Sequence, residues 1–292
     1  MATTTRNLLI VTGASRGIGQ ACAVAFAKHP TLRKNLHVCL IARSIDGLNQ
    51  TSDWISTEST TTTTTEPSGD LGFVKVSKYA VDLSDLDQLE GRIQTIFQEL
   101  DEASDLGPLS KAIFVNNAGS VGPLGPSHST SLSDIRSTID FNITSSIWLS
   151  SYFIQYFSKE RNTDKRPHCV VINMSSLCGV EPFKTMGVYC AGKASRDMFH
   201  AVMGKEEEDS EHHIKVLNYA PGPVESEMTH NLSESDELDS DVSSFFKTSL
   251  VEKTLIQPDV TANRLLDLVM TDNYKNGQHV DFYDLDKPKE EE

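Results

Sequence analysis

"NLLIVTGASRGIGQACAVAFAK", residues 7–28, joins a short apolar run to a glycine-rich turn and then to an apolar helical pattern. Glycines at positions 13, 17 and 19 let the backbone approach a diphosphate closely, and the start of a helix offers free N–H groups and partial positive charge. A glycine-rich turn alone is weak evidence, because it can be purely structural. Its place between a strand and a helix is typical of the first unit of a dinucleotide-binding fold.

The same alternation continues along the chain. Further strand-like runs, rich in β-branched residues, occupy residues 36–43, 74–83, 111–119, 169–176, 214–222 and 278–283, with helical patterns between them. In the longest such pattern, residues 84–102, Leu89, Ile93 and Leu100 recur at helical spacing. The alternation predicts an α/β fold, a single-domain, Rossmann-like, doubly wound sheet of seven parallel strands with helices on both faces. We expect this domain to span residues 1–286.

Three polar segments depart from the pattern. Residues 57–66, "TESTTTTTTE", are of low complexity and predict a loop with nothing to bury. Residues 233–244, "SESDELDSDVSS", predict an acidic loop, either simply solvated or forming a lid over a site. Residues 287–292, "KPKEEE", are expected to form a disordered tail.

Charge and cysteine content limit the possible partners. The 292-residue chain carries a formal net charge of −15, which argues against nucleic acid or an anionic membrane as the main partner. Its five cysteines form no CxxC pair, as is typical of reduced thiols, and the first apolar run is too short for a signal peptide. We therefore expect a cytoplasmic protein with a small-molecule partner, no metal site, no nucleic acid and no membrane.

The end of the second predicted strand indicates which dinucleotide binds. An acidic residue there suits the ribose 2′-hydroxyl of NAD, whereas a basic residue suits a 2′-phosphate. The chain has Arg43 and Ser44 at this point, and Arg16 lies in the glycine loop. Guanidinium groups pair well with phosphate oxygens, so we predict NADP(H). An ordinary solvated arginine is the alternative for Arg43.

A catalytic pattern lies after the fifth predicted strand. Ser176 is followed by Tyr189 and, four residues later, by Lys193. On a helix, Tyr189 and Lys193 would share a face, and the ammonium would lower the tyrosine pKa from its ordinary value of about 10. The phenol would then serve as a general acid near neutral pH, with Ser176 binding the same substrate oxygen. Alone, a tyrosine and a lysine at this spacing are common in purely structural helices.

These motifs do not stand alone. "TGASRGIG", "NNAG", Asn142, Ser176, "YCAGK" and "PGPV" follow one another in an order that resembles the short-chain dehydrogenase/reductase superfamily, from Leu8 to about Asp284. The resemblance implies a catalytic tetrad of Asn142, Ser176, Tyr189 and Lys193. In that family the tyrosine donates a proton to a carbonyl as hydride leaves the nicotinamide, the lysine also binds the nicotinamide ribose, and the asparagine supports a proton relay. Many members form homodimers, which we also expect here.

The expected cofactor-binding set combines these motifs and the carboxyl ends of the strands with residues 224–228, which the resemblance implies border the cofactor. It consists of Gly13, Ser15, Arg16, Gly17, Ile18, Gly19, Arg43, Ser44, Asp82, Leu83, Asn117, Ala118, Gly119, Tyr189, Lys193, Val224, Glu225, Ser226, Glu227 and Met228.

Three segments, residues 173–199, 215–228 and 276–284, are similar to one branch of the superfamily, the sepiapterin reductases. In that branch the aspartate matching Asp281 anchors a pterin ring, and one carboxylate can accept two parallel N–H bonds from such a ring. The implied substrate-binding residues are Ser176, Tyr189, Gly222 and Asp281, while Asp284 is expected to be solvated.

The implied reaction is NADPH-dependent reduction of side-chain carbonyls of a pterin, such as sepiapterin or 6-pyruvoyl-tetrahydropterin, in the final step of tetrahydrobiopterin biosynthesis. A reductase of diketones or other small carbonyl compounds is the alternative within the superfamily. A non-catalytic NADP(H)-binding sensor is a more remote one, because the chain keeps the whole tetrad.

Overall fold

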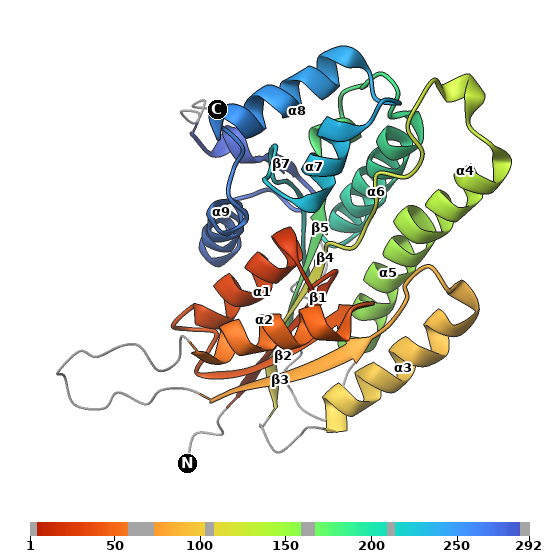
Figure 1. Ribbon diagram of the computed structural model, residues 1–292. Coiled ribbons are helices and arrows are strands. Elements are labelled where there is room, and N and C mark those ends of the chain that lie inside the picture. Colours follow the sequence, from red (N-terminus) through yellow and green to blue (C-terminus); the bar gives the residue numbers. More distant parts are fainter. Residues whose placement is uncertain (1–4, 58–72, 103–107, 159–166, 209–213, 287–292) are drawn as a thin grey trace.

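The computed structural model describes residues 5–57, 73–102, 108–158, 167–208 and 214–286. Within them, seven strands form one parallel sheet in the order β3-β2-β1-β4-β5-β6-β7 (Figure 1). The strands are β1 (Arg6–Thr12), β2 (Asn35–Ala42), β3 (Phe73–Ala80), β4 (Leu109–Asn116), β5 (His168–Met174), β6 (Ile214–Ala220) and β7 (His279–Asp281). The predicted doubly wound sheet is confirmed, and its last strand is shorter than expected.

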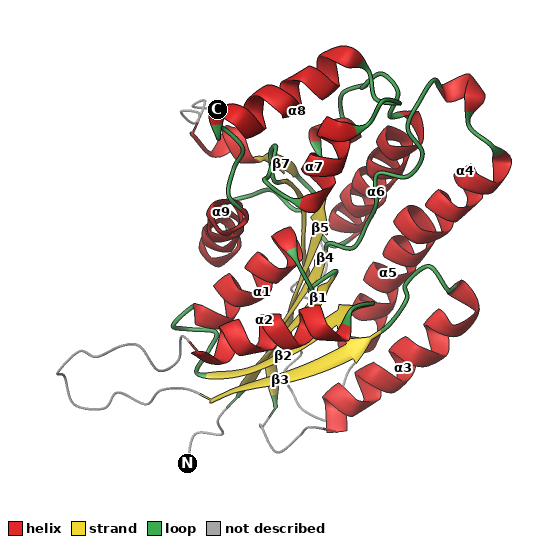
Figure 2. Cartoon of the chain, viewed as in Figure 1, coloured by secondary structure: helices red, strands yellow, loops and turns green. Residues whose placement is uncertain are grey.

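Helices cover both faces of the sheet, as Figure 2 shows. One face carries α1 (Gly17–Lys28), α2 (Ile45–Thr57) and α9 (Pro258–Thr271); the other carries α3 (Leu86–Glu102), α5 (Ser145–Phe157) and α6 (Gly187–Glu206). Before α5, α4 (Leu132–Ile139) is joined to it by a π-helical turn (Asp140–Thr144). Among the described residues, no helix has the length and apolar character needed to cross a membrane.

The core consists of two apolar layers, one on each side of the sheet. Successive residues of β1 alternate between them: Leu9 and Val11 pack with α1 and α9, whereas Leu8 and Ile10 pack with α3 and α5. The predicted stripe of α3 is buried in the second layer through Leu89, Ile93 and Leu100. Because both faces are covered, the central strands are almost entirely apolar.

The glycine-rich turn is held against the end of β4. Gly13 and Gly17 have positive φ angles of 64° and 57°, a region that side chains with a Cβ rarely adopt. A Cβ on Gly19 would lie 2.4 Å from the carbonyl oxygen of Gly13 and 2.5 Å from Nδ2 of Asn117. That amide group donates to the carbonyl of Thr12 at 3.0 Å, and Thr12 Oγ1 accepts from the backbone of Asn117 at 3.0 Å. Close packing with β4 therefore requires glycine at position 19.

The acidic run at residues 233–244 is a correction to the sequence prediction. It is not a loop: its ends belong to α7 (Glu227–Glu234) and α8 (Ser240–Glu252), and only residues 235–239 lie outside a helix. Ser226 caps α7 in a reciprocal capping box with Thr229, and the Asp239 carboxylate caps α8 by accepting from the amide of Asp241. Most of the threonine-rich segment, residues 58–66, and the tail at 287–292 lie outside the described residues.

We expect Gly19→Ala to lower the free energy of unfolding by about 1 to 3 kcal/mol, because the added methyl group must displace backbone atoms. Gly91→Ala is the matched control, since a Cβ at this exposed position of α3 meets nothing within 4 Å. The free energy of unfolding of this control should rise by about 1 kcal/mol, because alanine has a higher helix propensity than glycine. Urea unfolding followed by circular dichroism measures both; equal midpoints for Gly19→Ala and the wild type would refute the packing argument.

Candidate active site

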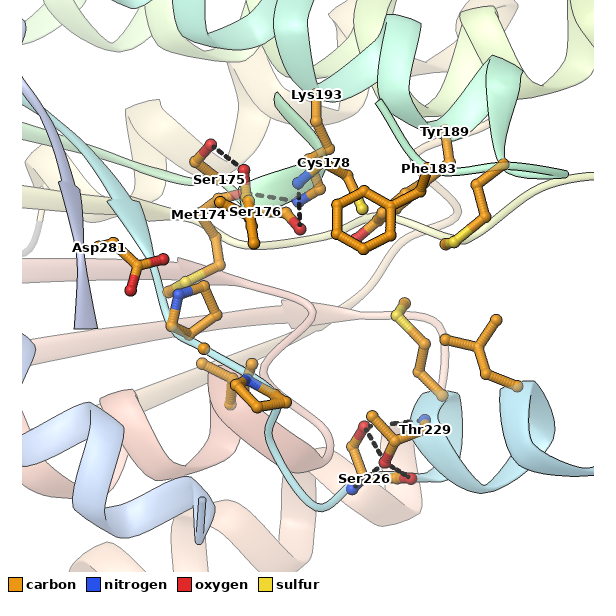
Figure 3. A pocket seen from close by; sticks show the side chains of 18 of the residues that line it. Met174, Ser175, Ser176, Cys178, Phe183, Tyr189, Lys193, Ser226, Thr229 and Asp281 are labelled. Carbon is orange, nitrogen blue, oxygen red and sulfur yellow. Dashed lines mark hydrogen bonds between the residues drawn. The ribbon is translucent and has the colours of Figure 1, made fainter. Parts of the chain in front are cut away.

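A cavity of about 910 Å³ opens at the carboxyl ends of the strands, bordered by α6, α7 and α8. Figure 3 shows Asp281 on one side of this cavity and Ser176, Lys193 and Tyr189 on another. The predicted site residues that line it are Ile18, Asn117, Gly119, Ser176, Tyr189, Lys193, Gly222, Ser226, Met228 and Asp281. The same cavity is therefore lined by residues predicted to act in catalysis, in cofactor binding and in substrate binding.

Ser176 follows β5 and begins the short 3₁₀ turn η4 (Leu177–Gly179). Its hydroxyl oxygen accepts a hydrogen bond from the backbone amide of Cys178 at 3.2 Å, which orients the side chain toward the cavity (Figure 3). The hydroxyl proton remains available to a substrate oxygen, because a serine oxygen both accepts and donates.

Tyr189 and Lys193 lie one turn apart on α6, and the ammonium of Lys193 is 5.7 Å from the centre of the Tyr189 ring. Lys193 is buried and donates to the carbonyl oxygen of Met174 at 2.6 Å. Burial, reinforced by the positive charge of Arg196, lowers the pKa of Lys193 to about 7. This lysine is therefore poised to exchange a proton near neutral pH.

The expected lowering of the Tyr189 pKa is wrong for this structure. Burial raises the pKa of the phenol above its ordinary value, and hydrogen bonding with Ser176 opposes the shift only in part. Desolvation is the largest cause of this shift, and the ammonium of Lys193 donates to the Met174 carbonyl. A raised pKa keeps the phenol protonated, which is the form that can donate a proton to a carbonyl oxygen.

Asn142 lies at the centre of the π-helical turn between α4 and α5 and is buried. Its Nδ2 donates to the carbonyl of Ser120 at 2.8 Å, and its Oδ1 accepts from the amide of Ser120 at 2.9 Å. The side chain thereby holds the segment that follows "NNAG". Asn142 does not line the cavity, but a Cβ added at Gly192, one residue before Lys193, would lie 3.7 Å from its Cβ.

Asp281 ends β7 and starts the 3₁₀ turn η5 (Phe282–Asp286). Its Oδ1 accepts from the amide of Tyr283 at 2.9 Å, while Oδ2 of Asp284 accepts from the amide of Asp281 at 3.0 Å. Asp284 is exposed, as predicted, yet it also lines the cavity and shapes this turn. The turn orients the Asp281 carboxylate and leaves acceptor capacity on both of its oxygens.

The glycine loop and α1 suit a dinucleotide diphosphate. Among the described residues, no side chain caps α1, and its first turn holds no acidic residue, so the amides at its start are available to an anion. Gly13 and Gly19 leave no room for a side chain between the loop and Asn117. The residues present therefore fit the diphosphate of a nicotinamide dinucleotide at this end of the cavity.

Several predicted cofactor residues lie around this region without lining the cavity, namely Gly13, Ser15, Arg16, Gly17, Gly19, Arg43, Ser44, Asp82, Leu83, Ala118, Val224, Glu225 and Glu227. The Arg16 guanidinium forms an ion pair with Glu227 of α7. Arg43 is exposed, and its charge contributes to lowering the pKa of Asp82, although hydrogen bonds from Ser84 are the larger cause. The Ser44 hydroxyl accepts from the amide of Gly47 at the start of α2.

Residues that sequence reasoning missed connect α6 to the sheet. Arg196 is fully buried and donates to Oδ1 of Asn173 at 2.8 Å and to the carbonyls of Asn116 at 2.6 Å and Ala118 at 3.0 Å. Asp197, the next residue, accepts from Nδ2 of Asn173 at 3.0 Å. A signal was present, because an asparagine recurs near the end of β4, β5 and β6, where apolar residues are the rule.

The remaining wall of the cavity is largely apolar. Phe183 and Met186 lie on the segment before α6, whereas Leu232, Phe245 and Phe246 come from α7 and α8. Of the acidic run itself, only Asp241 and Val242 line the cavity; the apolar residues Leu232, Phe245 and Phe246 flank the run on α7 and α8. Such a lining suits a flat or aromatic ligand whose reacting carbonyl reaches Ser176 and Tyr189.

Comparisons with known proteins indicate the family of this chain. A family model for short chain dehydrogenases matches residues 7–237. Sepiapterin reductase from Rattus norvegicus is 32% identical over 94% of this chain and 96% of its own length. Benzil reductase ((S)-benzoin forming) from Bacillus subtilis is 26% identical over 90% of this chain and 93% of its own. The crystal structure of the KRED1-Pglu enzyme superposes with a TM-score of 0.72 at 21% identity, covering 94% of this chain and all of that one.

The family model matches most of the chain, and the seven-stranded parallel sheet and the arrangement of Ser176, Tyr189 and Lys193 are consistent with it. This chain therefore belongs to the short-chain dehydrogenase/reductase superfamily, as an oxidoreductase that acts on CH–OH or C=O groups and is related to the sepiapterin reductases.

Proposed function

We propose that the protein catalyses the NADPH-dependent reduction of side-chain carbonyl groups of a pterin, in the final step of tetrahydrobiopterin biosynthesis. The observation that carries this proposal is that Asp281 lines the same cavity as Ser176, Tyr189 and Lys193. The similarity to sepiapterin reductases over 94% to 96% of the chain supports it. A carboxylate at one end and a proton donor at the other match the two chemical ends of such a substrate.

Asp281 would hold the ring end of the substrate. A pterin presents a guanidine-like edge with two N–H groups, and a carboxylate accepts two such bonds side by side. Oδ1 of Asp281 keeps its bond from the Tyr283 amide and still has a second lone pair for the ligand. The apolar side chains of Phe183 and Met186 would cover the flat ring.

At the other end, the carbonyl oxygen would lie between the Ser176 hydroxyl and the Tyr189 phenol. NADPH supplies the hydride when bound. As negative charge develops on the substrate oxygen, Ser176 donates a hydrogen bond and Tyr189 transfers its proton. Lys193, with a pKa of about 7, can then return a proton toward the tyrosine.

Selection of NADPH would rest on Arg43. Its guanidinium is exposed at the end of β2, and no hydrogen bond or ion pair engages it within the described part of the chain. The position suits a 2′-phosphate bound at the start of α2, where Ser44 already accepts from the Gly47 amide.

A reductase of diketones is the second candidate, and the relationship to benzil reductase supports it. The apolar wall formed by Leu232, Phe245 and Phe246 would also take an aromatic diketone, and such a substrate would not need Asp281.

We also propose that the protein is a cytoplasmic homodimer. Met198 and Val202 of α6 are 66% and 47% exposed and lie one turn apart, and α5 places Trp148 and Tyr152 in parallel contact nearby. Two copies of this apolar face would cover one another.

Oxidation of NADPH, followed by absorbance with sepiapterin and with benzil, tests the proposed function. We expect sepiapterin to be reduced with the higher kcat/KM, because only the pterin can use the Asp281 carboxylate. Turnover of benzil without any turnover of sepiapterin would overturn the pterin assignment in favour of the second candidate.

Asp281→Asn should raise the KM for sepiapterin by about 10- to 100-fold, because this factor corresponds to the free energy that a hydrogen bond to a charged group contributes. The amide oxygen of asparagine can still accept from Tyr283, so the turn is kept while the charge is lost. Affinity for NADPH, measured by fluorescence titration, should not change.

Asp284→Asn is the matched control, because it removes one charge from the same turn while preserving the bond to the Asp281 amide. Equal effects of the two variants would show that only the local charge matters and would contradict an anchoring role for Asp281.

Arg43→Glu should shift the ratio of NADPH to NADH dissociation constants by about 10- to 100-fold toward NADH, since it replaces an attractive contact to phosphate with repulsion. Arg136→Glu, at an exposed position of α4, makes the same change of charge elsewhere. Equilibrium titration with each nucleotide decides: an unchanged ratio in Arg43→Glu excludes this arginine from cofactor selection.

A further inference from the structure

A row of polar residues crosses the sheet beside the cavity. In the strand register, Asn116 of β4 pairs with Asn173 of β5, Asn173 with Asn218 of β6, and Asn218 with His279 of β7. Nδ2 of Asn173 donates to Oδ1 of Asn218 at 2.8 Å. His279 ends this row and lines the cavity two residues before Asp281.

Asp197 of α6 joins the row from one side of the sheet. Its Oδ1 accepts from Asn173 at 3.0 Å, and its Oδ2 lies 2.7 Å from Nδ1 of His279. The Asp197 side chain is only 10% exposed, so its charge needs a partner inside the protein. Because Asp197 follows Tyr189 and Lys193 at steps of four residues, all three side chains lie along one face of α6.

The contact between His279 and Asp197 links β7 to α6. It is an edge strand of three residues, paired with β6 through Asn218, Tyr219 and Ala220. Val280 points to the layer containing α9, whereas His279 and Asp281 alternate to the opposite side. Within the described chain, Nδ1 of His279 bonds to Asp197 while its buried Nε2 has no hydrogen-bond partner, so the orientation of the ring depends on Asp197.

We propose that His279 is a substrate-positioning residue: its bond to Asp197 ties β7 to the catalytic helix α6 and so sets the distance between the Asp281 carboxylate and the Tyr189 phenol. The inference rests on the proposed function, in which Asp281 holds the ring of the substrate. Protonation of the imidazole strengthens the tie, because it converts a hydrogen bond into an ion pair with a nearly buried carboxylate. Binding of the pterin therefore depends on the charge of His279.

The surroundings of His279 favour its charged form. Asp197 on α6, Asp281 on β7 and Asp284 on η5 all act in this direction, and burial opposes them. The hydrogen bond with Asp197 is the largest cause, and the pKa of His279 is raised above its ordinary value. The resulting stabilisation is fully present below the unfolded pKa of about 6.5 and is lost as pH rises through the higher folded pKa.

Two substitutions distinguish the effect of the hydrogen bond to Asp197 from the effect of protonating His279. His279→Asn keeps an N–H donor near the position of Nδ1 but cannot titrate, whereas His279→Val removes the donor. For the wild type, the KM for sepiapterin should rise about 10-fold between pH 6 and pH 9 relative to His279→Asn, whose profile should lack this step. His279→Val should show the raised KM throughout, and the three proteins should bind NADPH alike.

His128→Asn, at an exposed histidine that does not line the cavity, controls for loss of a histidine in general. If His279→Val does not fold, as judged by circular dichroism, the comparison of the wild type with His279→Asn decides. Identical pH profiles of KM in these two proteins would overturn the inference.

The pH dependence of thermal unfolding provides a readout without substrate. Relative to His279→Asn, the wild type should lose melting temperature as pH rises through the folded pKa of His279. If the wild type does not reduce sepiapterin, the proposed function fails, and this measurement still tests the bond to Asp197. If sepiapterin is reduced, but the KM and the melting temperature of the wild type depend on pH in the same way as those of His279→Asn, the proposed function stands and the role of His279 is refuted.

Discussion

The buried guanidinium of Arg196 connects the catalytic helix to the sheet. Its three nitrogens donate to Asn173 Oδ1 and to the carbonyls of Asn116 and Ala118, at the ends of β5 and β4. Burial lowers its pKa to about 10, so the group remains charged near neutral pH. Removing one partner of a buried charge typically costs about 3 to 5 kcal/mol, which makes this contact a strong constraint on where α6 lies. Tyr189 and Lys193 lie on the same helix, so the position of the proposed proton donor depends on this contact.

That constraint explains the unusual proton affinities at the site. Lys193 is enclosed with a second fixed cation, Arg196, and its pKa falls to about 7, whereas the phenol of Tyr189 is buried and its pKa is raised. Both shifts disfavour the charged form, as expected of groups removed from water. Together they favour a neutral phenol beside a lysine that exchanges its proton readily. This combination suits reduction of a carbonyl, in which the tyrosine must give up a proton only as negative charge appears on the substrate oxygen.

The sequence predicted the sheet, the glycine loop and the pairing of Tyr189 with Lys193, because each leaves a local pattern: apolar runs, glycines at a strand end, or a helical step of four. It did not predict the helix ends in the acidic run, since the charges of residues 233–244 resemble those of a solvated loop. The direction of the Tyr189 pKa was also missed, because a neighbour along the helix is visible in the sequence while burial is not. Arg196 and Asp197 acquire their roles only when β4, β5 and β7 meet α6.

A carboxylate on an edge strand can protect the edge or hold a ligand, and we propose that Asp281 does both. Charged groups on an edge discourage pairing with a second sheet, which would explain an acid anywhere along a short last strand. Asp281 lies at the carboxyl end of β7, lines the cavity, and accepts a hydrogen bond from the Tyr283 amide through Oδ1. Protection of the sheet edge alone would not require so specific a position. Arg264 of α9 holds the following turn through two bonds to Asp286, at 2.8 and 2.9 Å. β7 and η5 are thus attached to α6 on one side and to α9 on the other, which fixes the Asp281 carboxylate in the position that the proposed anchoring of a substrate requires.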